Sequence, residues 1–245
     1  MEYNTLDLET ADGMAIVTLN RPPMNAVTDE MLDELVSVCK ALESDATVHV
    51  VILTGAGRAF SAGRDVPGVL EGKERPGGSR YRILEEIDMP VIAAVNGFCF
   101  TGAFELAMCA DIIIASDQAK FADTHARFGI VPGGGQTQRL PRLIGTRKAK
   151  ELLFTGRQIS ADEAEQIGSV NKVVAHDSLM AEARTMAAQI LENIAETISI
   201  EKRLINQSMA TSLEEGLALE AAQHPSGKIS PTPEGREKMA ALFKK

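Results

Sequence analysis

Short, continuous apolar runs alternate with helical periodicity in the first half of the chain. Such runs predict strands buried on both faces of a parallel sheet, and they span residues 14–19, 48–53, 91–95 and 111–116. Between the first two, Thr28 is a candidate N-cap for a helix to about Leu42, with apolar residues three and four positions apart. Because strand, turn and helix repeat in this order, the pattern indicates an α/β layer structure with crossover helices.

After Phe121 the hydrophobic pattern becomes mainly helical. One strand, at residues 170–174, interrupts a series of predicted helices at residues 136–143, 147–154, 161–166, 180–195, 199–209, 213–222 and 233–243. A further short helix is predicted from Tyr81 to Ile87, where Pro90 ends it. We therefore divide the chain into an α/β body, residues 1–178, and a helical C-terminal lobe, residues 179–245.

The charge of the chain limits its partners. Its 245 residues carry a formal net charge of −9, which argues against nucleic acid or an anionic membrane surface as the main partner. The apolar runs are too short to span a bilayer, and the first residues lack the basic flank and apolar run of a signal peptide. We expect a cytoplasmic protein.

The cysteines do not suggest a metal or redox site. Cys39, Cys99 and Cys109 lie among apolar residues without a repeated C-x-x-C spacing, so we predict neither a disulfide framework nor a zinc site. The chain also lacks a phosphate loop and a dinucleotide fingerprint. No metal or redox cofactor is expected.

Two Gly-rich turns each follow a buried apolar run, at residues 54–65 (TGAGRAFSAGRD) and 96–102 (NGFCFTG). Ligands gather outside the carboxyl ends of parallel strands, where such turns lie. Tight turn geometry is a sufficient explanation for either one alone. Two turns in similar positions favour a binding site.

The second turn leads into a helix that carries a buried carboxylate. The first free backbone N–H groups of this helix lie near Gly102, at the positive end of its dipole, and Glu105 follows one turn later. The neighbours of Glu105 are apolar, and desolvation raises the pKa of a carboxyl group and suits it to proton transfer. The alternative is a buried Glu paired with an Arg for structural reasons.

Five sequence blocks occur in an order that resembles the crotonase (enoyl-CoA hydratase/isomerase) superfamily. They are NRPPMNA, TGAGRAFSAGRD, PVIAAVNGFCFTGAFELAMCAD, the stretch from Phe121 through PGGGQTQRLPRLIG, and LLFTGRQISADEAEQIGSVNKVV. The resemblance runs from about residue 6 to the C-terminus. It implies a ββα superhelix of stacked parallel sheets with crossover helices, and assembly as a homotrimer or a dimer of trimers.

The resemblance also implies where an acyl-CoA thioester would bind. Its thioester oxygen would accept hydrogen bonds from the N–H groups of Arg64 and Gly102, with Arg64 in place of the small residue more often found there. The CoA adenine would lie against the loop that contains Ser61, Ala62, Gly63 and Asp65, and Phe98 would line the acyl pocket. Asp65 could equally be a turn former, and core packing is an equal explanation for Phe98.

The chain departs from the family at one catalytic position. Family hydratases use two carboxylates; Glu105 matches the first, and the second falls on His125. Histidine transfers protons near neutral pH, and Asp123 could orient it if the segment is extended. The alternative is that His125 only lines the pocket and Glu105 acts alone. The segment between Asp65 and Pro90, which helps cover the acyl chain, also looks shorter than is usual in the family.

The expected function is reversible hydration of a 2-enoyl-CoA through an enolate. A first alternative is another reaction on the same scaffold, either isomerisation of an enoyl-CoA or hydrolysis of an acyl-CoA. A second alternative is a family member that binds acyl-CoA without catalysis.

Overall fold

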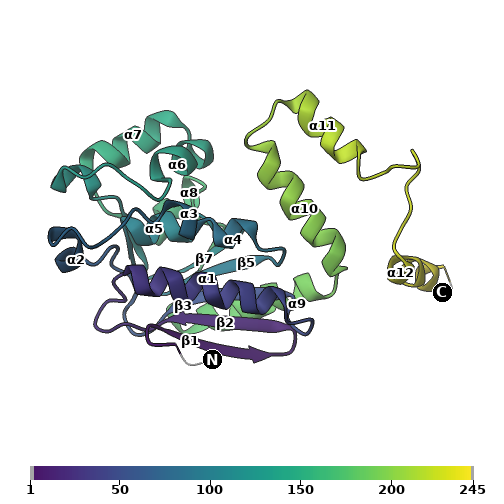
Figure 1. Ribbon diagram of the computed structural model, residues 1–245, viewed down its shortest axis with the longest axis horizontal. Coiled ribbons are helices and arrows are strands. Elements are labelled where there is room, and N and C mark those ends of the chain that lie inside the picture. Colours follow the sequence, from purple (N-terminus) through teal and green to yellow (C-terminus); the bar gives the residue numbers. More distant parts are fainter. Residues whose placement is uncertain (1–2, 244–245) are drawn as a thin grey trace.

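A six-stranded sheet forms the centre of the protein (Figure 1), whose computed structural model describes residues 3–243. Its strands lie in the order β1-β2-β3-β5-β7-β10, with β1 antiparallel to β2 and all other neighbours parallel. They are β1 (Leu6–Ala11), β2 (Met14–Leu19), β3 (Val50–Gly55), β5 (Val91–Val95), β7 (Ile112–Ser116) and β10 (Lys172–Val174). All five strands expected from the sequence are present, and β1 is an addition.

A second, four-stranded sheet was not expected from the local sequence pattern. Its strands are β4 (Ala59–Ser61), β6 (Phe98–Phe100), β8 (Lys120–Ala122) and β9 (Ile159–Ser160). β4, β6 and β8 each follow a strand of the first sheet after a short turn, and they pair in parallel. The repeated pair of strands confirms the ββα superhelix, and it places the carboxyl ends of β4 and β6 next to each other.

Helices cover one face of the large sheet. Thr28 caps α1 (Asp29–Glu43), since its side chain accepts a hydrogen bond from the N–H of Met31, and this helix buries Leu32 and Leu35. Beside it lie α3 (Gly78–Tyr81), α4 (Ile83–Glu86) and α5 (Gly102–Ala107) (Figure 1). The structure thus has two short helices where the sequence predicts one, and α2 (Val66–Leu70) precedes them.

The chain after β8 is helical, as expected. It contains η1 (His125–Phe128), α6 (Gln136–Ile144), α7 (Thr146–Thr155), α8 (Ala161–Gln166), η2 (His176–Ser178) and α9 (Leu179–Leu191). The last of these, α9, covers the other face of the large sheet, where Leu179, Ala183 and Ala187 pack against strand residues such as Ile52. The apolar side of α9 thus closes a core on this face of the sheet.

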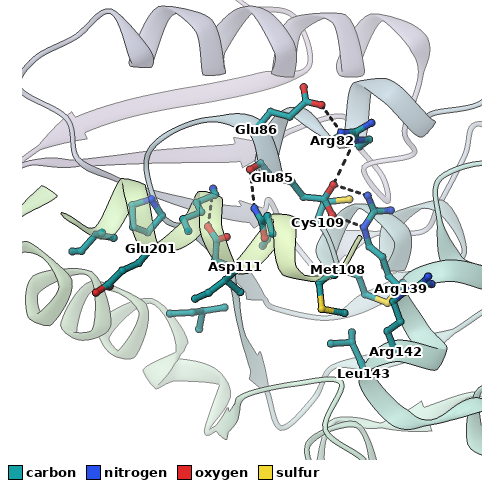
Figure 2. A pocket seen from close by; sticks show the side chains of 18 of the residues that line it. Arg82, Glu85, Glu86, Met108, Cys109, Asp111, Arg139, Arg142, Leu143 and Glu201 are labelled. Carbon is teal, nitrogen blue, oxygen red and sulfur yellow. Dashed lines mark hydrogen bonds and ion pairs between the residues drawn. The ribbon is translucent and has the colours of Figure 1, made fainter. Parts of the chain in front are cut away.

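Three helices extend from the body after α9 (Figure 1): α10 (Ala195–Ser208), α11 (Leu213–Ala221) and α12 (Pro233–Leu242). The side chain of Lys202 fastens α10, donating to the carbonyls of Leu84 (2.8 Å) and Met89 (2.9 Å) and pairing with Asp111 at 2.8 Å. Between α10 and the body lies a hollow of about 830 Å³ with charged and apolar walls (Figure 2).

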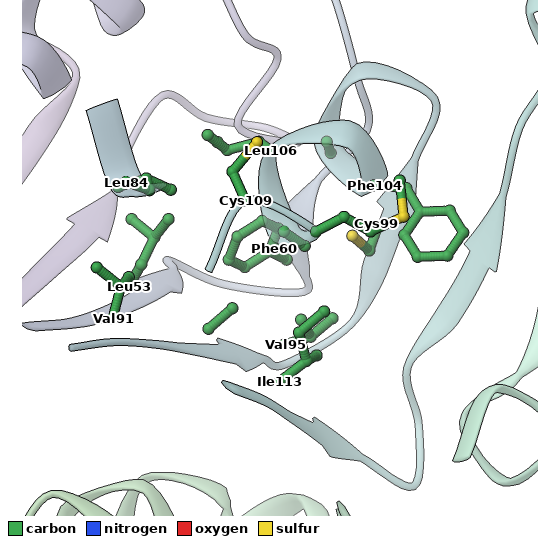
Figure 3. Close-up of a cluster of buried hydrophobic side chains, with 14 of the residues drawn as sticks. Leu53, Phe60, Leu84, Val91, Val95, Cys99, Phe104, Leu106, Cys109 and Ile113 are labelled. Carbon is green, nitrogen blue, oxygen red and sulfur yellow. The ribbon is translucent and has the colours of Figure 1, made fainter. Parts of the chain in front are cut away.

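The main core lies between the large sheet and the α1–α5 layer. Leu53, Val91 and Val95 on the sheet face Phe60 and Leu106 in the layer above (Figure 3). Cys39, Cys99 and Cys109 are buried free thiols, and burial raises the pKa of Cys39 to about 12. They are therefore packing residues that stay protonated at neutral pH.

Over the described residues, no helix combines the length and apolar character that crossing a membrane requires.

Candidate active site

The two Gly-rich turns meet at the carboxyl ends of β4 and β6. Gly63 has φ of +97°, and a methyl group added to it would lie 2.7 Å from the carbonyl oxygen of Phe100 and 3.5 Å from the nitrogen of Gly102. Both the backbone conformation and the close approach therefore require glycine. This contact sets Arg64, the next residue, beside Gly102.

The N–H groups of Arg64 and Gly102 remain available for a ligand. A parallel bridge to Val27 uses the carbonyl of Gly63 and the N–H of Asp65, which leaves the N–H of Arg64 unused. Gly102 begins α5, so its N–H has no acceptor within the helix. Within residues 3–243 neither group donates to another backbone group, and the two form a pair of free donors on adjoining turns.

Thr101 holds a strained conformation just before Gly102. Its φ is +55° and its ψ −115°, which is a costly backbone conformation for a β-branched residue. The N–H of Thr101 donates to the carbonyl of Ala122 at 2.7 Å, and its hydroxyl lies 2.9 Å from the hydroxyl of Thr124. These contacts with the neighbouring strand keep the turn in place, and they fix the direction in which α5 starts.

Glu105 is buried, with 2% of its surface exposed, and is held by backbone donors. Its Oε1 accepts hydrogen bonds from the N–H groups of Gly134 (2.8 Å) and Gln136 (3.1 Å). Burial raises the pKa of Glu105, although these N–H groups and the nearby His125 counteract part of the rise. The nearby Arg139 instead pairs with Glu85 at 2.5 Å (Figure 2). The alternative of a structural Glu–Arg pair therefore does not describe Glu105.

His125 is brought next to Glu105 and is oriented by Asp123. Its Nδ1 lies 2.9 Å from Oδ2 of Asp123, and its Nε2 lies 3.9 Å from Oε2 of Glu105. Burial lowers the pKa of His125, but the hydrogen bond and charge of Asp123, together with Glu105, outweigh it, so that the net pKa is raised. The three side chains thus form a buried line of carboxylate, imidazole and carboxylate.

Asp123 orients His125, as the sequence suggested, but the backbone at His125 is not the extended segment that was considered there. His125 begins η1 rather than continuing β8, and its own N–H donates to Oδ1 of Asp123 at 3.0 Å. Asp123 therefore forms a local side-chain turn that holds both the backbone and the ring of His125.

The loop expected to contact the CoA adenine is well ordered by internal hydrogen bonds. Ser61 Oγ accepts from the N–H of Gly63 at 3.2 Å, and the N–H of Ala62 donates to the carbonyl of Met24 at 3.0 Å. Asp65 caps α2 by accepting from the N–H of Gly68 and pairs with Arg21 at 2.9 Å. These contacts favour the interpretation of Asp65 as a turn former.

Phe98 lies at the other end of the strand that leads to Gly102. It begins β6, and its ring centroid is 5.3 Å from that of Phe100. Its place in an acyl pocket stays a prediction.

The side chain of Arg64 ties the segment of residues 66–80 to α1, a feature that the sequence analysis did not predict. Its Nη2 pairs with Asp29 at 2.7 Å and with Glu74, and donates to the carbonyl of Arg75. Asp29 also pairs with Arg75 and Arg80. Burial raises the pKa of Asp29, but its hydrogen bonds to these three arginines outweigh it and hold the pKa well below its usual value.

The sequence analysis assigned no role to three further residues of the site: Tyr81, Gly134 and Gln136. Gly134 and Gln136 supply the N–H groups that hold Glu105, and they come from the turn before α6 and its first residue. A hollow of about 420 Å³, lined among others by Gly78, Gly134 and Arg142, lies against this turn.

Across residues 3–243 we find no group of three or more His, Cys, Asp or Glu side chains suited to a metal ion.

Comparison with known proteins identifies the family. The sequence matches the enoyl-CoA hydratase/isomerase family over residues 9–234. It is 41% identical to a short-chain-enoyl-CoA hydratase from Clostridium acetobutylicum and 38% identical to a crotonyl-CoA hydratase from Syntrophomonas wolfei, in each case over 100% of this chain and 97% of the relative. The chain belongs to the enoyl-CoA hydratase/isomerase (crotonase) family.

Solved structures agree with this assignment. An enoyl-CoA hydratase subunit from Geobacillus kaustophilus superposes with a TM-score of 0.91 at 34% identity, over 100% of this chain and 96% of that chain. The crotonase fold expected from the sequence is therefore confirmed over the whole chain.

Proposed function

We propose that the protein is a hydro-lyase that reversibly adds water to a short 2-enoyl-CoA thioester. The observation that carries the proposal is the position of Glu105, one helical turn after the free N–H of Gly102 and 3.9 Å from the imidazole of His125. The names of the two relatives, a short-chain-enoyl-CoA hydratase and a crotonyl-CoA hydratase, support the substrate class.

The N–H groups of Arg64 and Gly102 bind the thioester oxygen in this proposal. Main-chain donors are rigid, so they stabilise the negative charge that develops on this oxygen without reorganising, and one such donor contributes about 3–4 kcal/mol. Because the donors belong to the backbone, the arginine side chain at position 64 is compatible with this role.

Glu105 and His125 carry the protons. Water attacks carbon 3 and gives a proton to the Glu105 carboxylate, while the electron pair of the double bond moves through carbon 2 onto the thioester oxygen. The imidazolium of His125 then donates a proton to carbon 2 as the enolate collapses. Proton transfer from Glu105 to His125 restores the starting state, and the net change is addition of one water.

Steady-state turnover of crotonyl-CoA tests the proposal. Loss of the near-ultraviolet absorbance of the conjugated thioester, with formation of 3-hydroxybutyryl-CoA, is the expected result. Conversion of a 3-enoyl-CoA without water addition would instead assign an isomerase, release of free CoA thiol would assign a hydrolase, and binding without any turnover would assign a non-catalytic acyl-CoA protein.

An enoyl-CoA isomerase is the second candidate, and one observation favours it. Only one of the two family carboxylates is present, because His125 occupies the second position. Isomerisation moves a single proton between carbons of the acyl chain, and Glu105 alone is sufficient for that step.

The active form is a homotrimer or a dimer of trimers in the cytoplasm in this proposal. α11 has no buried residue in the single chain, and Leu213 and Leu217 on it are 80% and 57% exposed. Exposed leucines on a helix that extends from the body are typical of a surface covered by another copy. The buried free thiols are consistent with a reducing compartment.

A further inference from the structure

Tyr81 places a hydroxyl group without an acceptor inside the candidate active site. The residue ends α3 and is 1% exposed. The Arg64 guanidinium is close enough to donate to its oxygen, but its own O–H finds no acceptor within the described part of the chain. Buried polar side-chain groups nearly always have partners, because an unsatisfied one is costly. A donor left unpaired in this way points to an acceptor that arrives with a ligand.

Three glycines make room for the Tyr81 side chain. A methyl group on Gly77 or Gly134 would lie 2.4–2.8 Å from atoms of its ring, so any side chain at these positions would collide with it. A methyl group on Gly102 would lie 2.9 Å from the hydroxyl oxygen. The ring is therefore fixed between two backbone segments, and the hydroxyl is directed at the glycine whose N–H is one of the two free donors.

The carboxylate of Glu105 lies close to the ring of Tyr81. The methyl position on Gly134 that is 2.4 Å from the ring of Tyr81 is also 2.6 Å from Oε2 of Glu105. Burial and then the charge of Glu105 raise the pKa of Tyr81, against smaller opposite effects of the charge of Arg64 and of its hydrogen bond to the tyrosine oxygen. The hydroxyl therefore keeps its proton at neutral pH and acts as a hydrogen-bond donor.

We propose that Tyr81 is a further catalytic residue, whose hydroxyl donates a hydrogen bond to the thioester oxygen of the bound acyl-CoA beside the N–H of Gly102. The inference rests on the proposed binding of an acyl-CoA at this site. It adds a side-chain donor to the two backbone donors, and the donor strengthens as negative charge develops on the oxygen.

The approach of the substrate involves the side chain of Arg64. Cγ of Arg64 lies 3.2 Å from the methyl position on Gly102, and its Nη1 is buried without a hydrogen-bond partner among the described residues. The thioester that reaches Tyr81 displaces these side-chain atoms. Its oxygen supplies the acceptor that the unliganded site lacks.

Tyr81→Phe removes only the hydroxyl and keeps the ring between Gly77 and Gly134. We expect kcat/KM for crotonyl-CoA to fall about tenfold to a hundredfold, the range for a hydrogen bond to a developing charge. The midpoint temperature of unfolding should change little, since the lost O–H has no acceptor within residues 3–243. Tyr3→Phe, a change in the other tyrosine of the chain, is the matched control and should leave kcat/KM unchanged.

An unchanged kcat/KM in Tyr81→Phe would overturn the inference. A gain in activity would do so too, because it would mean that the ring serves only as an apolar wall of the site. Binding of acetoacetyl-CoA separates this result from the fate of the proposed reaction, because its enolate absorbs in the near ultraviolet and needs no turnover. If the wild type does not hydrate crotonyl-CoA, a weaker enolate band in Tyr81→Phe still supports the role of the hydroxyl. Equal bands in the two proteins refute it.

Discussion

Glu105 is held by peptide N–H groups rather than by an arginine, and this difference suits it to proton transfer. The bonds from Gly134 and Gln136 fix one carboxylate oxygen, while burial keeps the pKa raised. Glu105→Gln keeps a similar shape, so acyl-CoA binding should persist while kcat for crotonyl-CoA falls about 100-fold or more, as is usual for an acid–base group. Isothermal titration and steady-state kinetics measure the two effects. Near-wild-type turnover would remove Glu105 from the mechanism.

The pKa of His125 predicts a pH dependence of activity. Because the folded protein raises this pKa above 6.5, the imidazolium that donates a proton is present at low pH and is lost as the pH rises through the raised value. The kcat profile of the wild type should therefore fall on its alkaline side. Asp123→Asn removes the charge that raises the pKa of His125 and leaves one acceptor oxygen in place of two, so the fall should begin at lower pH.

Replacement of His125 separates its two interpretations. His125→Gln should lower kcat and abolish the alkaline fall, whereas His125→Glu fills the second family position and should restore hydration. A modest change in KM with an unchanged pH profile would mean that His125 only lines the pocket. That outcome would favour the isomerase.

The sequence alone could predict site residues whose role is visible from their immediate neighbours or from their position in a motif. Glu105 stood out because a carboxylate among apolar residues one turn after a Gly-rich turn is unusual, and position in the family motif indicated His125. Tyr81 and Gln136 could not be predicted in this way. Their roles depend on contacts between α3, α5 and the turn before α6, which are distant in the sequence.

Short strands hid part of the fold from an analysis of local periodicity. β3 and β5 are long apolar runs in the main core, and a helical or strand period is readable over such lengths. β4, β6 and β8 have three residues each, too few to display a period, yet their parallel pairing brings Gly63 next to Gly102. The resemblance to a family therefore provided what local periodicity could not.

Asp29 is the carboxylate with the most ion pairs to the arginines that hold the segment of residues 66–80. Asp29 pairs with Arg64, Arg75 and Arg80, so Asp29→Asn should loosen the segment and speed tryptic cleavage at Lys73 and Arg75. Asp33→Asn is the matched control, since Asp33 is more exposed and makes only longer contacts of 3.3–3.5 Å with two of these arginines. Equal cleavage rates in the two variants would show that Asp29 does not secure the segment.

The attachment of α10 to the body depends on a buried cation. Lys202 pairs with Asp111 and donates to two carbonyls, and Lys202→Met would remove all three contacts and leave the carbonyls of Leu84 and Met89 without this donor. The free energy of unfolding should fall by about 1–3 kcal/mol, as measured by urea denaturation. Arg203→Met removes an exposed pair with Asp88 and should change it by less than about 1 kcal/mol. Similar losses in both variants would contradict the anchoring role.

The part of the chain after α10 exposes apolar side chains that a second copy of the protein could cover. Helices α11 and α12 and the residue after them leave large apolar side chains on the surface, among them Leu213, Leu217 and Phe243. A single chain would gain nothing by exposing them, whereas a second copy packed against α11 would bury them.

Light scattering at micromolar concentration should therefore give a mass of three or six times 26.3 kDa. Leu217→Glu places a charge in the middle of α11, where burial in an interface would be costly, so the variant should shift toward smaller species. Glu214→Gln, which alters an exposed residue of the same helix without adding a charge or apolar bulk, should keep the wild-type mass. A monomeric wild type would refute the assembly, and an unshifted mass in Leu217→Glu would place the interface elsewhere on the molecule.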